Sequence, residues 1–103
     1  NPYLAFALML RAGLDGLVNR IEPPLATFKN VYIMTPEERT AEGITSLPGD
    51  IYEAVQELRE DEVMVDALGP HVLEHYVEAK MIEWDIYRIQ VHDWEIKQYL
   101  QVF

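Results

Sequence analysis

The sequence contains no cysteine in its 103 residues. This absence excludes disulfide frameworks, thiolate zinc sites and cysteine nucleophiles, and it suits a reducing compartment. We therefore expect a cytoplasmic protein. The chemistry that remains available is that of carboxylates, aromatic side chains and three histidines.

Basic residues are also scarce. Eight Lys and Arg residues stand against eighteen Asp and Glu residues, which gives a net charge of -10. Binding to a phosphate backbone needs clustered Lys and Arg, whereas these eight are spread along the chain. The same charge opposes binding to anionic membranes. We expect neither nucleic acid nor a membrane as a partner, and we interpret the acidity as a solvated outer surface.

Long hydrophobic runs are missing as well. The run from Pro2 to Leu10 is much shorter than the roughly 20 residues that span a bilayer, and it lacks the basic start and cleavage site of a signal peptide. These residues are nevertheless apolar on every side of the helix that they predict, which is typical of a helix inside a large core. Since they open a short chain without an initiator Met, we expect a fragment of a larger protein.

The remaining pattern predicts a mostly α fold, with about four to six helices joined by extended connectors. We expect four consecutive parts along the chain. They are a core helix over residues 1–22, a connector with a short helix over 23–49, an acidic helical region over 50–90 and a C-terminal tail over 91–103.

Proline and glycine set the expected ends of the first two helices. The pair Pro23-Pro24 is expected to end the first helix. Residues 25–34 read as an extended segment, after which Thr35-Pro36-Glu37-Glu38 forms a capping box and Gly43 closes a short helix. Gly13 and Gly16 fall inside the first helix, where glycine usually marks the close approach of another backbone.

The acidic region carries its own start and stop signals. Asp50 caps a helix whose outer face is rich in Glu, and Asp61 caps a short turn that Gly69-Pro70 ends. The longest helix of this half is expected from His71 to about Gln90.

One local motif resembles a catalytic site. The sequence His71-Val72-Leu73-Glu74-His75 matches the H-x-x-E-H pattern of inverted zinc peptidases, in which two His bind zinc and Glu acts as general base. A catalytic zinc would need a third ligand and a cleft. We interpret these residues instead as surface histidines near a helix start. No glycine-rich phosphate loop or activated hydroxyl is visible either, so this stretch carries no apparent active site.

The tail ends in large apolar side chains. Burying Trp94, Leu100 and Phe103 would contribute about 1.5 to 3 kcal/mol each, which requires a surface that receives them.

The ordered motifs resemble the C-terminal catalytic domain of glutamine synthetases. Asn1-Pro2-Tyr3-Leu4-Ala5-Phe6-Ala7 and Ala12-Gly13-Leu14-Asp15-Gly16-Leu17 resemble the signature helix of that family. The resemblance covers essentially the whole chain and follows the order of the type I bacterial and archaeal enzymes. It continues through Ile21-Glu22-Pro23-Pro24, Lys29-Asn30-Val31-Tyr32, Pro36-Glu37-Glu38-Arg39, Leu47-Pro48, Glu53-Ala54, Glu78-Ala79-Lys80, Glu83-Trp84-Asp85 and His92-Asp93-Trp94-Glu95.

The resemblance implies a segment of an α+β catalytic domain. The parent enzyme would activate glutamate as γ-glutamyl phosphate with ATP and Mg²⁺ or Mn²⁺, and then capture ammonia to give glutamine. The metal ligands and the substrate-binding arginine of the family precede the Asn-Pro-Tyr motif. No catalytic, cofactor-binding or metal-binding residue is therefore expected here. We expect the fragment to be inactive, and we expect neither ATP nor a metal ion to be bound to it.

The resemblance also implies a homo-oligomer of two stacked hexameric rings, in which the C-terminal tail inserts into a subunit of the opposite ring. It makes interface residues of Trp94, Ile96, Tyr99, Leu100 and Phe103.

Regulation is the other property that the resemblance bears on. Tyr32 matches a tyrosine that is adenylylated in some members, where Asp-Leu-Pro follows it, but here Ile33-Met34-Thr35 follows. The chain thus resembles the branch that is controlled by glutamine feedback and regulatory proteins, and we do not expect modification of Tyr32.

Two alternatives stay open. A related ligase that joins glutamate to a polyamine would share this segment, since its amine specificity lies elsewhere. A free-standing acidic helical module that binds a partner through its apolar ends would share its composition.

Overall fold

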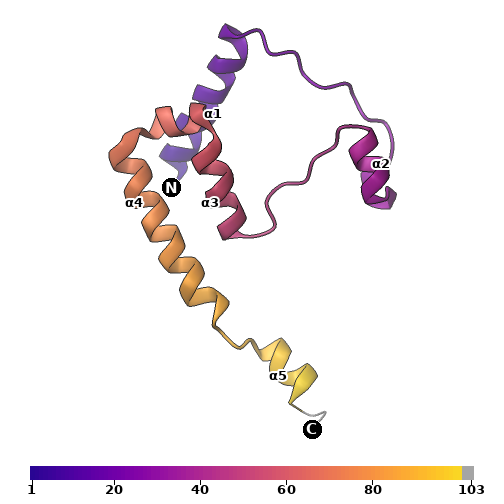
Figure 1. Ribbon diagram of the computed structural model, residues 1–103, viewed down its shortest axis with the longest axis vertical. Coiled ribbons are helices and arrows are strands. Elements are labelled where there is room, and N and C mark those ends of the chain that lie inside the picture. Colours follow the sequence, from indigo (N-terminus) through magenta and orange to yellow (C-terminus); the bar gives the residue numbers. More distant parts are fainter. Residues whose placement is uncertain (101–103) are drawn as a thin grey trace. The chain divides into compact units, whose positions relative to one another are not determined.

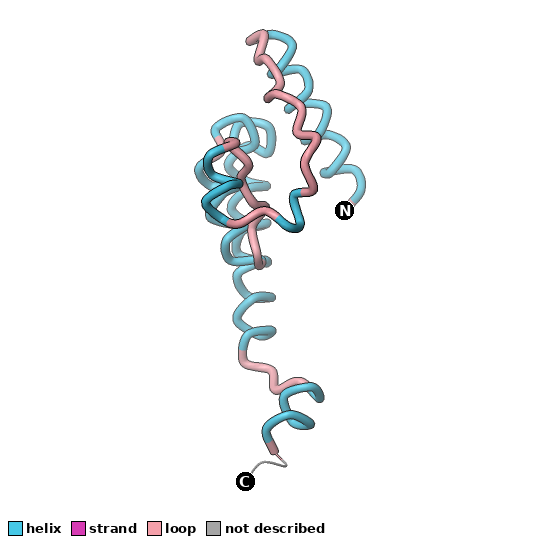
Figure 2. The backbone as a smooth tube through the Cα atoms, turned by 90° about the vertical axis from the view of Figure 1, so that its right-hand side faces the viewer, coloured by secondary structure: helices cyan, strands magenta, loops and turns pink. Residues whose placement is uncertain are grey.

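The computed structural model describes residues 1–100, which form two units, residues 1–49 and residues 50–100. Within these residues the chain has five α-helices, one 3-10 helix and no strand, so the expected mostly α fold is confirmed (Figures 1 and 2). The elements are α1 (Pro2–Val18), η1 (Val31–Ile33), α2 (Pro36–Ala41), α3 (Ile51–Glu60), α4 (Glu62–Arg88) and α5 (Asp93–Tyr99).

Helix α1 starts at a side-chain cap that the sequence analysis did not identify. The Asn1 side-chain oxygen accepts hydrogen bonds from the backbone N–H groups of Tyr3 at 3.0 Å and Leu4 at 3.4 Å. Pro2 occupies the first turn, where its missing N–H costs nothing. The start of α1 therefore combines the two residue types that favour a helix N-terminus.

Helix α1 ends at Val18, so its expected extension to residue 22 is wrong. Arg20 adopts a positive φ of 52°, which stops helix propagation before the proline pair is reached. The Ile21 N–H donates to the Gly16 carbonyl at 2.9 Å, and the Arg20 N–H donates to the Leu17 carbonyl at 3.4 Å. These two bonds form a Schellman motif with Arg in the position that usually holds glycine.

The capping box of α2 is confirmed. The Thr35 N–H donates to Glu38 Oε2 at 2.8 Å, and the Glu38 N–H donates to Thr35 Oγ1 at 3.3 Å. Gly43, at φ 68°, closes the helix as expected, because the Ile44 N–H reaches back to the Arg39 carbonyl at 2.8 Å.

The expected extended segment over 25–34 is interrupted by η1. The Asn30 side chain accepts a hydrogen bond from the Tyr32 N–H at 3.1 Å and caps this single turn. Met34 follows the turn and is the one buried apolar side chain of residues 1–49. The local cap therefore explains why a β-branched and aromatic stretch turns here instead of extending.

Residues 50–100 are organised around the packing of α3 against α4. The expected caps are confirmed, since Asp50 Oδ1 accepts from the Glu53 N–H at 2.9 Å and Asp61 Oδ1 accepts from the Met64 N–H at 3.0 Å. Val55 of α3 and Val77 of α4 are the buried residues of this pair. These two side chains form the buried core of this unit.

Helix α4 is kinked at the expected stop signal. Gly69 lies outside the helical region at φ 68° and ψ 162°, and Pro70 follows it. The secondary structure is helical on both sides, so α4 consists of two helical halves that meet at this residue.

Helix α5 begins where the His92 N–H donates to Glu95 Oε2 at 2.8 Å. Its start is connected to the end of α4 by the stacking of His92 and Tyr87, whose ring centres lie 5.3 Å apart. Phe103, which we expect in the interface tail, lies outside the described residues.

Candidate functional site

The residues of the H-x-x-E-H motif lie on α4, just after the kink. His71, Glu74 and His75 are all exposed, and the two imidazole rings meet edge to face with their centres 4.6 Å apart. Within residues 1–100 no group of three or more His, Asp or Glu side chains is placed to hold a metal ion. The catalytic zinc of a peptidase needs three protein ligands, so the described residues do not form such a centre.

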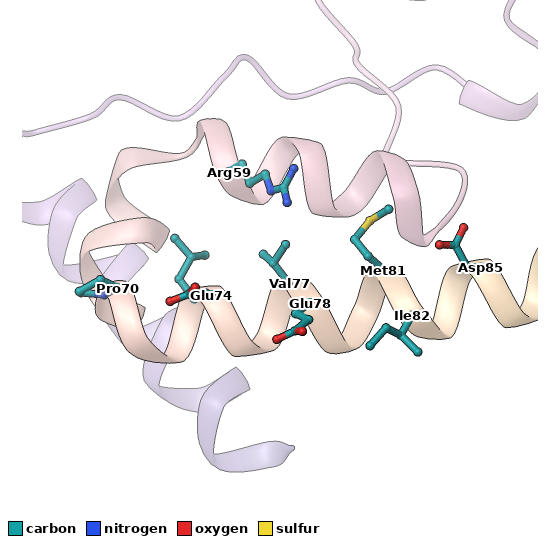
Figure 3. Close-up of a pocket in the computed structure, with 9 residues that line it drawn as sticks. Arg59, Pro70, Glu74, Val77, Glu78, Met81, Ile82 and Asp85 are labelled. Carbon is teal, nitrogen blue, oxygen red and sulfur yellow. The ribbon is translucent and has the colours of Figure 1, made fainter.

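A groove of about 660 Å³ runs along α4 where it faces α3 (Figure 3). Val77 and Met81 rise from α4 toward α3, while Arg59 reaches in from α3. Acidic side chains from α4 complete the lining, and they are Glu74, Glu78 and Asp85. The groove thus has an apolar floor and a mainly acidic edge, with no Ser, Thr, Cys, Lys or His among its lining residues.

A second hollow, of about 540 Å³, lies between the η1 turn and α2. Lys29 and Glu42 line it and form an ion pair that joins the two ends of residues 29–42. The hydrogen bond to Glu42 raises the pKa of Lys29 above its usual value, and the charge of Glu42 adds to the effect. Sequence reasoning missed this pair, since thirteen residues separate its members.

Tyr32 lies in η1 and is 99% exposed. Its side chain belongs to no core, and its backbone N–H is held by Asn30 at 3.1 Å. The structure therefore leaves the phenol open to solvent without placing catalytic side chains around it.

The expected interface residues of the tail form an exposed apolar surface on and just after α5. Trp94 is 63% exposed and Leu100 is 74% exposed, and Ile96 and Tyr99 are exposed as well. The Trp94 and Tyr99 rings meet edge to face with their centres 6.1 Å apart. We call these four residues the tail surface.

Helix α1 is mostly apolar and has no buried residue. Its exposed large side chains are Tyr3, Phe6, Met9, Leu10, Leu14, Leu17 and Val18. A Cβ atom added at Gly13 or Gly16 would meet nothing within 4 Å. Within residues 1–49, no backbone makes the close approach that these glycines were expected to mark.

No helix in residues 1–100 is long and apolar enough to cross a membrane.

Comparison with known proteins identifies the family. The sequence profile described as "Glutamine synthetase, catalytic domain" matches residues 1–99. The chain belongs to this family. Among curated proteins it is 50% identical over 100 residues to the glutamine synthetase of Thermotoga maritima, with 97% of this chain and 23% of the relative covered.

Two further relatives span bacteria and archaea. The chain is 48% identical over 103 residues to the glutamine synthetase of Clostridium saccharobutylicum, with 100% of this chain covered, and 49% identical over 102 residues to that of Methanosarcina mazei, with 99% covered. In each case the chain spans 23% of the relative's length. The expected resemblance to glutamine synthetases is thus confirmed.

Proposed function

We propose that this chain is the C-terminal segment of a glutamate–ammonia ligase, which forms glutamine through γ-glutamyl phosphate. The observation that carries the proposal is the match of residues 1–99 to the glutamine synthetase catalytic domain, together with 48–50% identity to the three glutamine synthetases above. The segment works as part of a longer polypeptide that binds the substrates.

Within that polypeptide, the role of this segment is packing and subunit contact. The exposed apolar side chains of α1 and of the tail surface support this role, because exposed apolar area of this kind is stabilising only when another surface covers it. Tail residues Trp94, Ile96, Tyr99, Leu100 and Phe103 contact a neighbouring subunit, and the complete enzyme is a cytoplasmic homo-oligomer of two stacked hexameric rings. Control by feedback and regulatory proteins, without modification of Tyr32, belongs to the same proposal.

ATP and Mg²⁺ or Mn²⁺ serve the reaction elsewhere in the longer polypeptide. Divalent ions stabilise the charge of a transferring phosphoryl group. Within residues 1–100 no group of three or more His, Asp or Glu side chains is placed to hold such an ion, so we assign no contact with the Mg²⁺ or Mn²⁺ of the reaction, or with ATP, to this segment.

The test is an assay of the polypeptide that contains this segment. With glutamate, ammonium, ATP and Mg²⁺ present, we expect phosphate release together with glutamine, which amino-acid analysis detects. The 103-residue chain alone serves as the control and releases no phosphate. A longer polypeptide that accepts a polyamine in place of ammonium would overturn the ammonia assignment, and turnover by the chain alone would overturn the packing role.

A further inference from the structure

The pair of histidines on α4 is not used by the proposed function. His71 and His75 are four residues apart, which places them on the same side of the helical segment that follows Pro70. Both side chains are exposed, and their ring centres are 4.6 Å apart. Two imidazoles that bind one tetrahedral zinc ion at about 2.0–2.1 Å have ring centres about 5 Å apart, which is close to the observed separation of 4.6 Å.

The carboxylate of Glu78 lies near one of the two rings. Its Oε2 lies 3.8 Å from Nδ1 of His75, which is just beyond hydrogen-bond distance. At this distance the carboxylate favours a positive charge beside His75 without a hydrogen bond to its ring.

The charges around the pair favour a cation. Residues 71–79 contain Glu74 and Glu78 and no Lys or Arg. Lys80 is bound to Glu83 at 2.5 Å, and the one cationic side chain that faces this part of α4 from α3 is Arg59, across the groove. The two carboxylates therefore outnumber the single facing guanidinium.

We propose that His71 and His75 form a two-imidazole binding site for Zn²⁺, in which water completes the coordination. Imidazole nitrogen suits Zn²⁺, whereas Mg²⁺ prefers oxygen ligands. The site binds metal without catalysing hydrolysis, because the third protein ligand of a catalytic zinc centre is missing from the described residues.

The three histidines of the sequence allow a matched test. Zinc chloride is titrated into the untagged 103-residue chain and followed by calorimetry and by the histidine ring NMR signals. We expect one Zn²⁺ per chain, with shifts of the His71 and His75 signals. Replacing either His71 or His75 by Ala weakens binding by more than about tenfold, since even loss of an outer-shell partner costs about 10- to 100-fold.

His92→Ala is the control. His92 lies against Tyr87 in the α4–α5 link, and its replacement leaves zinc affinity unchanged. Glu78→Gln weakens binding by up to about tenfold, because it removes a negative charge that lies close to His75. Circular dichroism of each metal-free variant checks that its helix content equals that of the parent chain.

Zinc affinity is then measured for the same four variants of the longer polypeptide. The difference in affinity between each variant and the unchanged polypeptide separates the contribution of this pair from that of other metal sites. Equal zinc affinity in the parent and the His71→Ala variant would overturn the proposal, as would equal losses in His71→Ala and His92→Ala. The result is independent of glutamine formation, so the ligase proposal and the zinc proposal fail separately.

Discussion

Gly43 holds a backbone conformation that other residues rarely adopt. Its φ is 68°, and a Cβ atom added there would meet nothing within 4 Å. The constraint is thus on the dihedral angle and not on space. Gly13 has the same open surroundings but lies inside α1, where its conformational freedom is a cost.

The same substitution is therefore expected to have opposite effects at these two positions. Gly43→Ala destabilises the end of α2 by about 1 kcal/mol, and Gly13→Ala stabilises α1 by up to about 1 kcal/mol. Amide hydrogen exchange measures both effects, and exchange at Ile44, whose N–H closes α2, rises about fivefold in the Gly43 variant. Faster exchange in both variants would contradict this reading of Gly13.

Caps were predictable because they depend on residues three positions apart. The caps at Thr35, Asp50 and Asp61 follow the sequence prediction for this reason. Asn1 before Pro2 carries the same type of signal. The left-handed conformation of Arg20 had no such signal, because nothing in the side chain of Arg favours a positive φ.

At the scale of elements, α3 and α4 depend on two small side chains. Val55 is 3% exposed and Val77 is 6% exposed, and no larger side chain among residues 50–100 is buried as fully. Burial between these two helices is therefore most complete at these two side chains.

We expect Val55→Ala to lower the free energy of unfolding of the α3–α4 pair by about 2 kcal/mol, from lost apolar burial and the cavity that remains. The matched change on an exposed face is Ile86→Ala, because Ile86 is 58% exposed, and it costs less than about 1 kcal/mol. Urea unfolding followed by circular dichroism measures both values. A similar loss in the two variants would mean that Val55 does not anchor this packing.

Features that depend on residues far apart in the chain are harder to predict from the sequence than helix caps. The helices of the acidic region followed from their apolar spacing, and the break at Gly69 followed from the Gly-Pro pair. The end of α1 and the Lys29–Glu42 pair depend on the path of the chain after the helix, which local patterns do not fix.

At the scale of the whole molecule, large apolar side chains are exposed in both units of the chain. The tail surface and α1 carry large apolar side chains that are exposed. Periodicity could identify these faces, but only the family resemblance suggested what covers them. The sequence therefore predicts the apolar residues of the tail surface, but it does not predict the surface that covers them.

Assembly is the property that this surface predicts. Trp94→Ala in the longer polypeptide raises the dissociation constant between subunits by at least about tenfold, because a buried Trp is a typical interface anchor. Lys97→Ala on the same short helix is the control and leaves assembly unchanged. Sedimentation velocity measures both, and full assembly of the Trp94 variant would exclude the tail from the interface.

The kink at Gly69 also divides α4 into separate cooperative units. Helix growth adds one residue at a time to an existing nucleus, and a residue outside the helical region stops it. Residues 62–68 are too few to persist alone, since isolated helices shorter than about 12–15 residues are marginal in water. Residues 70–88 exceed that length, with Pro70 already fixed near helical φ at the start. On unfolding, the segment that joins α3 to the kink should therefore melt before the segment that carries the histidine pair.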